Sequence, residues 1–227
     1  MRRRAYVELA PMADNVEEDA LRVALAQQYR YVGSLGLNEL ASGNLSCRLG
    51  ADAMLISPGG ATPESMQPES AVKVMLDGAW AGERKPSSEW RMHAAIYQQH
   101  AAAGAVVHTH SDYCVAVASH NQPLPGFHYL VGSFGGNDVP CVSYATFGTD
   151  ELARNAANAL TDRTACLLGN HGMICRGDDL ASAVEAAHRL EIMCRQYVLA
   201  RQLGEPDVLN DAQWKDFFER ARAAGYL

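Results

Sequence analysis

The sequence places two histidines one residue apart, in the segment Ala105-Val-Val-His-Thr-His110. The apolar run predicts a β-strand, and side chains on a strand repeat with a period of two. His108 and His110 should therefore project from the same face, where two neutral ring nitrogens could chelate a metal ion. The alternative is a pair of histidines that hydrogen-bond to neighbouring groups near a strand end.

A third histidine lies in the turn Gly169-Asn-His171-Gly172, directly after the apolar run 165–168. A turn that follows a buried strand lies at a sheet edge, and functional side chains often occupy such loops. His171 is therefore a further candidate ligand, with ordinary turn formation as the alternative.

Three polar segments are typical of anion sites. Segment 86–89 reads Pro-Ser-Ser-Glu and begins a predicted helix, where free N–H groups and the helix dipole favour a phosphate. Segments 41–46 and 57–60 contain glycines, which let backbone amides approach an anion closely. When each segment is taken singly, plain helix capping is the preferred explanation for 86–89, and the two glycine segments have a composition that is common in loops. The candidate phosphate-binding residues are Gly43, Asn44, Gly59, Gly60, Ser87 and Ser88.

Short strands and amphipathic helices alternate along the chain, and several successive strands are too close together for a crossover helix. The sequence therefore predicts one α/β domain over residues 1–227, with three α/β/α layers, a mixed, largely antiparallel central sheet and a C-terminal helical tail from about residue 205. The predicted strands are 44–48, 53–56, 71–76, 105–110, 139–144, 165–168 and 173–175. The predicted helices begin at the Asn15 capping box and after Ser88 and Ser111, and span 149–160, 178–204 and 210–224.

The net charge of −7 disfavours nucleic acids and anionic membranes as partners. The six cysteines contain no Cys-x-x-Cys pair and mostly lie in apolar runs, which is typical of a reducing compartment. The basic start, residues 1–4, is followed by acidic residues instead of an apolar signal segment, and no run is long enough to span a bilayer. We therefore expect a cytoplasmic protein.

Taken together, these segments resemble the class II aldolase and adducin family, in particular its members that act on fuculose phosphate. The resemblance spans nearly the whole chain, in the family's order and spacing. It is carried by segments 42–46, 56–60, 86–90, 105–110 and 168–172, together with His128-Tyr129, Gly135-Gly-Asn137 and Tyr144-Ala-Thr-Phe-Gly148.

The resemblance implies a divalent metal, usually zinc, bound by Glu89, His108, His110 and His171. It also implies that the glycine and serine segments bind the phosphate of a small phosphorylated sugar. Tyr129 would reach the site of a neighbouring subunit as a proton donor, within a homotetramer that has its sites at subunit interfaces. Without the resemblance, Tyr129 would be interpreted as a buried aromatic near a subunit contact.

The implied reaction is the reversible cleavage of a ketose 1-phosphate into dihydroxyacetone phosphate and an aldehyde. L-Fuculose 1-phosphate and a deoxy- or methylthio-pentulose 1-phosphate are the expected kinds of substrate, and Glu89, once released from the metal, would carry a proton. Sugar-phosphate 4-epimerases, dehydratases and decarboxylases share this scaffold and metal set. Adducin-type interaction modules share the fold but lack the full metal set, which this chain retains.

The sequence departs from the family at two places. The second phosphate segment often carries a threonine where this chain has Gly59, and the mobile tyrosine of the tail falls at Ala224, with Tyr226 two residues later. The aldehyde end of the substrate is therefore left open. The remaining histidines, His93, His100 and His188, are interpreted as packing or surface residues, and Phe147 as a core or interface aromatic or one that lines the site.

Overall fold

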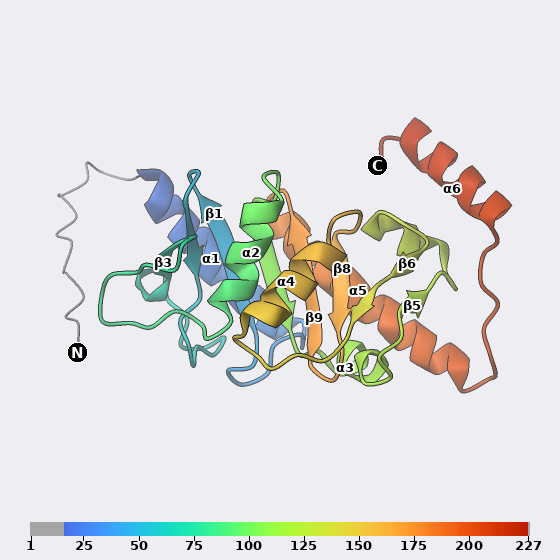
Figure 1. Cartoon of the computed structure of the whole chain (residues 1–227), viewed down its shortest axis with the longest axis horizontal. Coiled ribbons are helices and arrows are strands. Elements are labelled where there is room, and N and C mark those ends of the chain that lie inside the picture. Colours follow the sequence, from blue (N-terminus) through green and yellow to red (C-terminus); the bar gives the residue numbers. More distant parts are fainter. Residues whose placement is uncertain (1–15, 227) are drawn as a thin grey trace.

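The computed structural model describes residues 16–226, so Asn15 of the predicted capping box lies outside the described residues. Within this range, seven strands form one sheet in the order β3-β2-β1-β4-β9-β8-β7 (Figure 1). They are β1 (Asn44–Leu49), β2 (Ala53–Ile56), β3 (Val72–Met75), β4 (Ala105–Thr109), β7 (Cys141–Val142), β8 (Ala165–Leu168) and β9 (Gly172–Gly177). Among the described residues, β7 and β8 form the one parallel pair in this sheet, which confirms the predicted mixed, largely antiparallel sheet.

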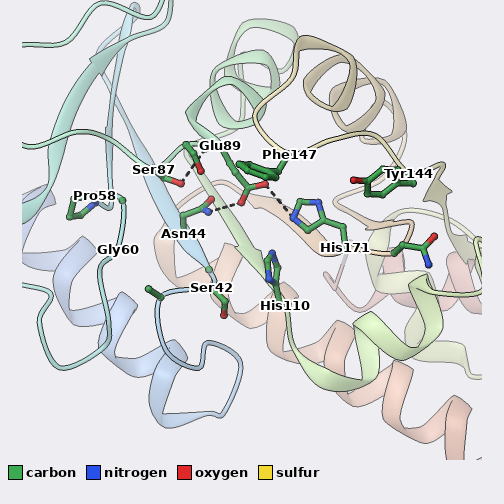
Figure 2. A pocket seen from close by; sticks show the side chains of 15 residues that line it. Ser42, Asn44, Pro58, Gly60, Ser87, Glu89, His110, Tyr144, Phe147 and His171 are labelled. Carbon is green, nitrogen blue, oxygen red and sulfur yellow. Dashed lines mark hydrogen bonds and ion pairs between the residues drawn. The ribbon is translucent and has the colours of Figure 1, made fainter.

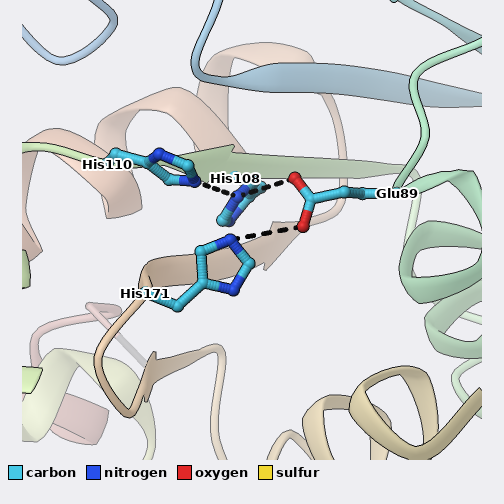
Figure 3. A group of neighbouring side chains, drawn as sticks. All are labelled: Glu89, His108, His110 and His171. Carbon is cyan, nitrogen blue, oxygen red and sulfur yellow. Dashed lines mark hydrogen bonds and ion pairs between the residues drawn. The ribbon is translucent and has the colours of Figure 1, made fainter. Parts of the chain in front are cut away.

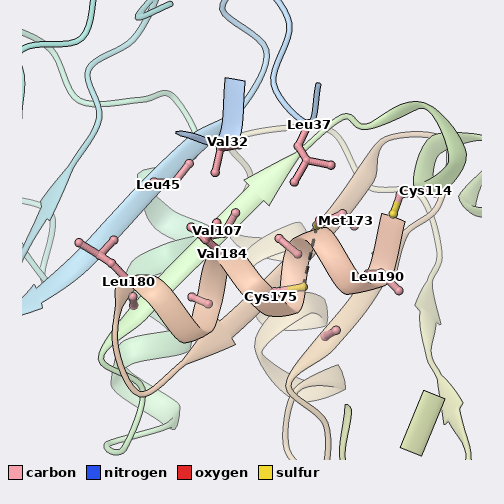
Figure 4. Packing of buried hydrophobic residues seen from close by; sticks show 14 of the residues in the cluster. Val32, Leu37, Leu45, Val107, Cys114, Met173, Cys175, Leu180, Val184 and Leu190 are labelled. Carbon is pink, nitrogen blue, oxygen red and sulfur yellow. Dashed lines mark hydrogen bonds between the residues drawn. The ribbon is translucent and has the colours of Figure 1, made fainter. Parts of the chain in front are cut away.

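Helices cover both faces of the sheet, in the predicted three layers (Figure 1). Alternation along β4 sends Ala105 and Val107 into the core beneath one helical layer and Val106 into the core beneath the other. The first layer contains α1 (Val16–Ser34), α3 (Asp112–Ala118) and α5 (Leu180–Arg201), and the second contains α2 (Trp90–Gln99) and α4 (Asp150–Ala159). Figure 4 shows Val184 and Leu190 of α5 packed toward strand residues such as Leu45 and Val107.

The prediction of a single strand over 139–144 is wrong. Residues 138–139 form β6 (Asp138–Val139), which pairs with β5 (Leu124–Pro125), whereas β7 joins the main sheet beside β8. Pro140 lies between them and has no N–H to donate, so a continuous ladder through it is not available. The chain then leaves the sheet, and the loop after β7 carries Tyr144 and Phe147 to the cavity described below.

Two other local predictions change in detail. Strand β4 ends at Thr109, so His110 lies just beyond the strand. Ser111 is the N-cap of α3 but its side chain makes no cap hydrogen bond. The carboxylate of Glu191 on α5 instead accepts the backbone N–H groups of Tyr113 and Cys114, at 3.0 and 2.9 Å.

The predicted last helix is present as α6 (Asp211–Ala223), with Asn210 and Gln213 forming a capping box. Trp214 of α6 is buried, and Phe217 packs close to Gly132 of the 3-10 segment η2 (Tyr129–Phe134). A second 3-10 segment, η1 (Pro68–Ser70), precedes β3. Within residues 16–226 no helix has the length and apolarity needed to cross a membrane. That the full chain 1–227 forms one domain with this tail stays a prediction.

Candidate active site

Four side chains from three separate parts of the chain converge beside the end of β4 (Figure 3). They are Glu89, His108, His110 and His171, and one ligand atom from each lies within 4.8 Å of the others. The Nε2 atoms of His108 and His110 are 3.0 Å apart. The carboxylate oxygens of Glu89 lie 3.0 Å from Nε2 of His108 and 3.3 Å from Nε2 of His171. The structure thus brings together all four residues that the sequence singled out as candidate ligands.

The sheet explains this convergence. His108 is the second-last residue of the fully buried strand β4, and β9 runs antiparallel beside it. The tight turn that joins β8 to β9 therefore lies at the same edge of the sheet. Asn170 in that turn adopts a left-handed conformation with φ of 53°, and the turn carries His171 toward the cluster. A Cβ atom on Gly172 would lie 2.4 Å from the carbonyl oxygen of Thr109, so only glycine allows the two segments to approach this closely.

Glu89 approaches from the opposite layer, as the N-cap residue of α2. Its N–H donates to Oγ of Ser87 at 3.3 Å, and its Oε2 accepts a hydrogen bond from Nδ2 of Asn44 at 3.0 Å. Asn44 lies directly opposite His108 in the β1–β4 register. Glu89 is therefore held on one side by a helix start and on the other by a strand, and its side chain is almost completely buried.

The hydrogen bonds of His108 show that a positive charge belongs in the cluster. Its Nδ1 lies 2.7 Å from the carbonyl oxygen of Met173, which can only accept, so Nδ1 carries a proton. In the neutral ring Nε2 is then a bare lone pair that faces a carboxylate oxygen of Glu89. A proton on Nε2 would remove the repulsion in that one contact only. A metal ion could accept a lone pair from each of the four ligand side chains. One of these ligand atoms could be the buried Oε1 of Glu89, which has no hydrogen-bond partner. The donor set fits a metal ion.

The pKa values follow from burial and mutual charge. Burial alone would raise the pKa of Glu89, but the charges of His108 and His171 and the hydrogen bonds from His108 and Asn44 together outweigh it and hold that pKa well below its ordinary value. Burial, with the charge of His108, lowers the pKa of both His110 and His171 to about 4. These two imidazoles are therefore neutral at pH 7, which is the form that binds metals.

A cavity of about 400 Å³ opens onto the cluster (Figure 2). Glu89, His110 and His171 form part of its wall, while His108 lies buried behind them. All six predicted phosphate-binding residues line the same cavity, namely Gly43, Asn44, Gly59, Gly60, Ser87 and Ser88. Tyr144 and Phe147 lie across the cavity near His171, so Phe147 takes the site-lining position that the sequence left open.

Backbone hydrogen bonds hold the three polar segments against one another. The carbonyl oxygen of Ser57 accepts a hydrogen bond from the N–H of Ser87 at 3.1 Å. The N–H of Ser57 donates to the carbonyl oxygen of Leu45 at 2.9 Å. Gly59 donates its N–H to the carbonyl of Lys85 at 3.1 Å. Gly43 has no room for a side chain, because a Cβ would lie 2.9 Å from the carbonyl oxygen of His108. The cavity wall is thus a connected backbone framework.

The sequence matches the family described as "Class II Aldolase and Adducin N-terminal domain" over residues 23–198, a range that contains the cluster and the cavity. The chain belongs to the class II aldolase and adducin family. One relative is the Rhodospirillum rubrum protein named 5-methylthioribulose-1-phosphate/5-deoxyribulose-1-phosphate aldolase. It is 42% identical to this chain, and the matched region covers 91% of this chain and 93% of the relative. L-Fuculose phosphate aldolase from Escherichia coli is 40% identical, over 84% of this chain and 89% of its own.

Solved structures agree with the family assignment. The structure of an L-fuculose 1-phosphate aldolase superposes with a TM-score of 0.85 at 33% identity, covering 94% of this chain and 99% of that chain. The predictions of family and fold class are therefore confirmed. The family match and the curated relatives together identify this chain as a class II aldolase, with a group of four side chains that could hold a metal ion.

Tyr129 is not among the residues that line the cavity of its own chain. It begins η2, is 51% exposed, and stacks on His128 with ring centroids 4.8 Å apart. Tyr226 is also exposed, and Ala224 is the C-cap residue of α6. Within one chain, therefore, neither Tyr129 nor residues 205–226 of the tail contribute to the cavity wall.

The sequence interpretation missed one group of residues behind Glu89. His93, interpreted as a packing or surface residue, is completely buried and makes two side-chain hydrogen bonds, to Ser46 and Asn44. Its position four residues after Glu89 places both side chains on the same face of α2, which is a signal that the sequence contains. Ser46 and Asn44 share one face of β1 by the same logic of spacing.

Proposed function

We propose that this chain is a zinc-dependent aldolase that reversibly cleaves a ketose 1-phosphate into dihydroxyacetone phosphate and an aldehyde. The observation that carries the proposal is the position of the four-residue cluster in the wall of a cavity whose remaining wall is built from glycine and serine segments. Metal chemistry and an anion-binding surface thus meet in one cavity, as a phosphorylated ketose substrate requires.

Three imidazoles and one carboxylate form a donor set typical of zinc. When bound, Zn²⁺ supplies Lewis-acid stabilisation of the negative charge that develops beside the ketone carbonyl as the carbon–carbon bond breaks. Because His110 and His171 are neutral, they leave most of the metal's positive charge available for this purpose. Zinc is therefore our proposal for the metal, and metal analysis of the purified protein would test it.

The phosphate would be bound by the framework around Gly43, Gly59, Gly60 and Ser87. The N–H groups of Gly43, Gly59 and Ser87 are already used in hydrogen bonds that hold this framework together. The anion would therefore meet the helix start and the serine hydroxyl groups in the cavity wall. Binding the phosphate there orients the reacting carbon toward the cluster, and such orientation makes a substantial contribution to catalysis. Since Gly59 has no hydroxyl, we propose that a backbone N–H or water makes this contact.

Glu89 is proposed to act both as metal ligand and as the group that moves a proton at the reacting carbon. Its carboxylate lines the cavity and is desolvated, and a carboxylate released from a cation in such surroundings gains basicity. Tyr129 is proposed to donate the proton at the aldehyde end of a site on the neighbouring subunit. Its exposure, and its absence from the residues that line its own cavity, support that role.

The proposed substrate is L-fuculose 1-phosphate or a deoxy- or methylthio-pentulose 1-phosphate. The names of the relatives from Escherichia coli and Rhodospirillum rubrum support these two kinds of sugar. We further propose a homotetramer in the cytoplasm. The six cysteines, all within the described residues and none in a disulfide, support a reducing compartment.

A panel of ketose 1-phosphates tests the proposal. Each is incubated with the zinc-loaded protein, and dihydroxyacetone phosphate is detected with a coupled reductase, while the products are also separated and identified. We expect release of dihydroxyacetone phosphate from at least one member of the panel. An epimerised, dehydrated or decarboxylated product in its place would contradict the aldolase reaction, and a protein without stoichiometric metal would favour an adducin-like module.

A further inference from the structure

A continuous chain of buried polar groups runs from Glu89 into the core between β1 and α2. Nδ2 of Asn44 lies 3.0 Å from Oε2 of Glu89, and Oδ1 of Asn44 lies 2.5 Å from Nε2 of His93. Nδ1 of His93 lies 2.7 Å from Oγ of Ser46, which lies 2.8 Å from the hydroxyl of Tyr97. His93, Ser46 and Tyr97 are almost completely buried and do not line the cavity, so water cannot replace a missing partner there.

Chemistry assigns a direction to every bond in this chain. The carboxylate of Glu89 accepts, so the amide of Asn44 must present its NH₂ group there and its oxygen to His93. Nε2 of His93 then carries the proton, and Nδ1 accepts from the hydroxyl of Ser46. Ser46 in turn receives the hydroxyl proton of Tyr97. One arrangement of protons satisfies all four of these hydrogen bonds.

The surroundings keep His93 in the form that this arrangement needs. Burial, helped by the charge of nearby His108, lowers the pKa of His93 to about 3. The imidazole is therefore neutral at pH 7, with one nitrogen free to accept. A protonated ring would turn a second N–H toward Ser46, which could accept it but would have to release its own hydroxyl proton elsewhere.

We propose that His93 is a positioning residue that acts through Asn44 to hold the carboxylate of Glu89 in place for metal binding and proton transfer. This inference rests on the proposed function, in which Glu89 is both a metal ligand and the group that transfers a proton. Without the N–H of His93, the amide of Asn44 can turn over and present its oxygen to the carboxylate, where two acceptors repel each other. Outer groups of this kind orient metal ligands in many proteins.

Asn44 also connects this chain of hydrogen bonds to the cavity, because it lines the cavity wall beside Gly43. A turned amide would change the group that this wall offers to a ligand as well as the group that it offers to Glu89. A histidine that only filled space in the core would have neither effect. The two roles can therefore be separated by variants that change hydrogen bonding in different places.

The test compares His93→Leu with His100→Leu in the full-length, metal-free protein. His100 lies at the end of the same helix and hydrogen-bonds to the carbonyl of Ala157 at 2.9 Å, with no link to Glu89. Co²⁺ alone is titrated into each variant, and its visible absorption reports both affinity and coordination geometry. We expect His93→Leu to weaken Co²⁺ binding on the order of 10-fold and to change the spectrum. His100→Leu should match the wild type in both measurements.

Two further variants keep the test decisive if His93→Leu folds poorly. In His93→Gln the side-chain amide can still donate to Asn44, so it should retain more of the Co²⁺ affinity than His93→Leu does. In Ser46→Ala the imidazole loses the donor that fixes its proton on Nε2, so the affinity should fall between those of the wild type and His93→Leu. Unfolding by urea, measured for every variant, separates a loss of stability from a loss of metal binding.

Equal Co²⁺ affinities and spectra for the wild type, His93→Leu and Ser46→Ala would overturn the positioning role. A wild-type protein that binds no Co²⁺ would overturn it too. A wild-type protein that binds the metal but releases no dihydroxyacetone phosphate would contradict the proposed function alone, and the Co²⁺ affinities of the variants would still decide this inference.

Discussion

Glu89 combines two demands that ordinarily conflict. A metal ligand should be ionised and firmly placed, whereas a group that moves a proton should gain basicity when it is released. Here the charge of His108 and the N–H of Asn44 stabilise the ionised form, and burial opposes it. The basicity of Glu89 therefore depends on whether its carboxylate is bound to a cation.

Replacing Glu89 by glutamine tests this dual role. Glu89→Gln keeps three imidazole ligands, so we expect most of the bound metal to remain. The amide cannot accept a proton, so turnover should fall about 10²- to 10⁴-fold. Metal analysis and the coupled reductase assay measure the two effects side by side. Turnover close to that of the wild type would remove Glu89 from the proton-transfer step.

The low pKa of His93 predicts how stability depends on pH. Burial, with the charge of His108, lowers that pKa from 6.5 in the unfolded chain to about 3 in the folded one. Below pH 6.5 the unfolded state therefore takes up a proton that the folded state refuses, and the free energy of unfolding decreases. Between pH 6.5 and pH 5.0 this single group should cost about 2 kcal/mol.

Urea unfolding of the metal-free protein at these two pH values provides the measurement. His93→Leu lacks the titrating group, so its free energy of unfolding should fall by about 2 kcal/mol less over the same interval. His100→Leu should show the same pH dependence as the wild type. Parallel pH dependences for the wild type and His93→Leu would show that the pKa of His93 is the same in the folded and the unfolded protein, which would contradict the prediction.

The cavity wall depends on how strands, turns and helix α1 are joined. Tyr29 of α1 is buried, and its hydroxyl lies 3.1 Å from the carbonyl oxygen of Gly43 and 2.9 Å from that of Ala61. Both carbonyls can only accept, so the tyrosine proton is shared between the first glycine segment and Ala61, the residue directly after the second glycine segment. One side chain therefore connects the two segments that are proposed to bind the phosphate.

Removing that hydroxyl should loosen both segments. We expect Tyr29→Phe to lower the free energy of unfolding by about 1 kcal/mol and to raise the KM for a ketose 1-phosphate while leaving kcat nearly unchanged. Tyr31→Phe is the matched control, because Tyr31 lies on the same helix and its side chain is half exposed. A fall in kcat at unchanged KM would show that Tyr29 does not act through substrate binding.

Exposed aromatic side chains suggest how neighbouring copies of the chain would contribute residues to one another's active sites. Tyr129 and Tyr144 are exposed, yet one begins η2 and the other lies at the cavity. In a ring of identical subunits each contact joins two different surface patches, so η2 of one subunit can face the cavity of the next. The proposed tetramer with shared sites has this arrangement.

Mixing two inactive variants tests whether sites are shared. Tyr129→Phe should cleave the sugar phosphate poorly while still exchanging a proton on dihydroxyacetone phosphate, because it acts only at the aldehyde end. When it is dissociated and reassembled with Glu89→Gln, about a quarter of the sites in a random mixture should combine an intact Glu89 with an intact Tyr129. Recovery of cleavage in the mixture would support shared sites. No recovery, in mixed oligomers shown to form, would place both residues in one subunit's site.

The sequence by itself determined the family, the mixed sheet and the candidate residues, since these depend on local patterns. A period of two puts His108 and His110 on one face, and glycines and serines mark the polar segments. The resemblance to a known family then grouped His171 and Glu89 with them. Their catalytic roles, and that of Tyr129, stay predictions.

Only the tertiary structure decided which of these groups meet. Distances between residues far apart in the chain depend on strand order and register, as when the β1–β4 pairing puts Asn44 opposite His108. The same nonlocal pairing links His93 to Glu89 and assigns residues 138–139 and 141–142 to two different sheets. Local patterns carry no record of such pairing, because contacts across a sheet are determined by the packing of all its layers at once.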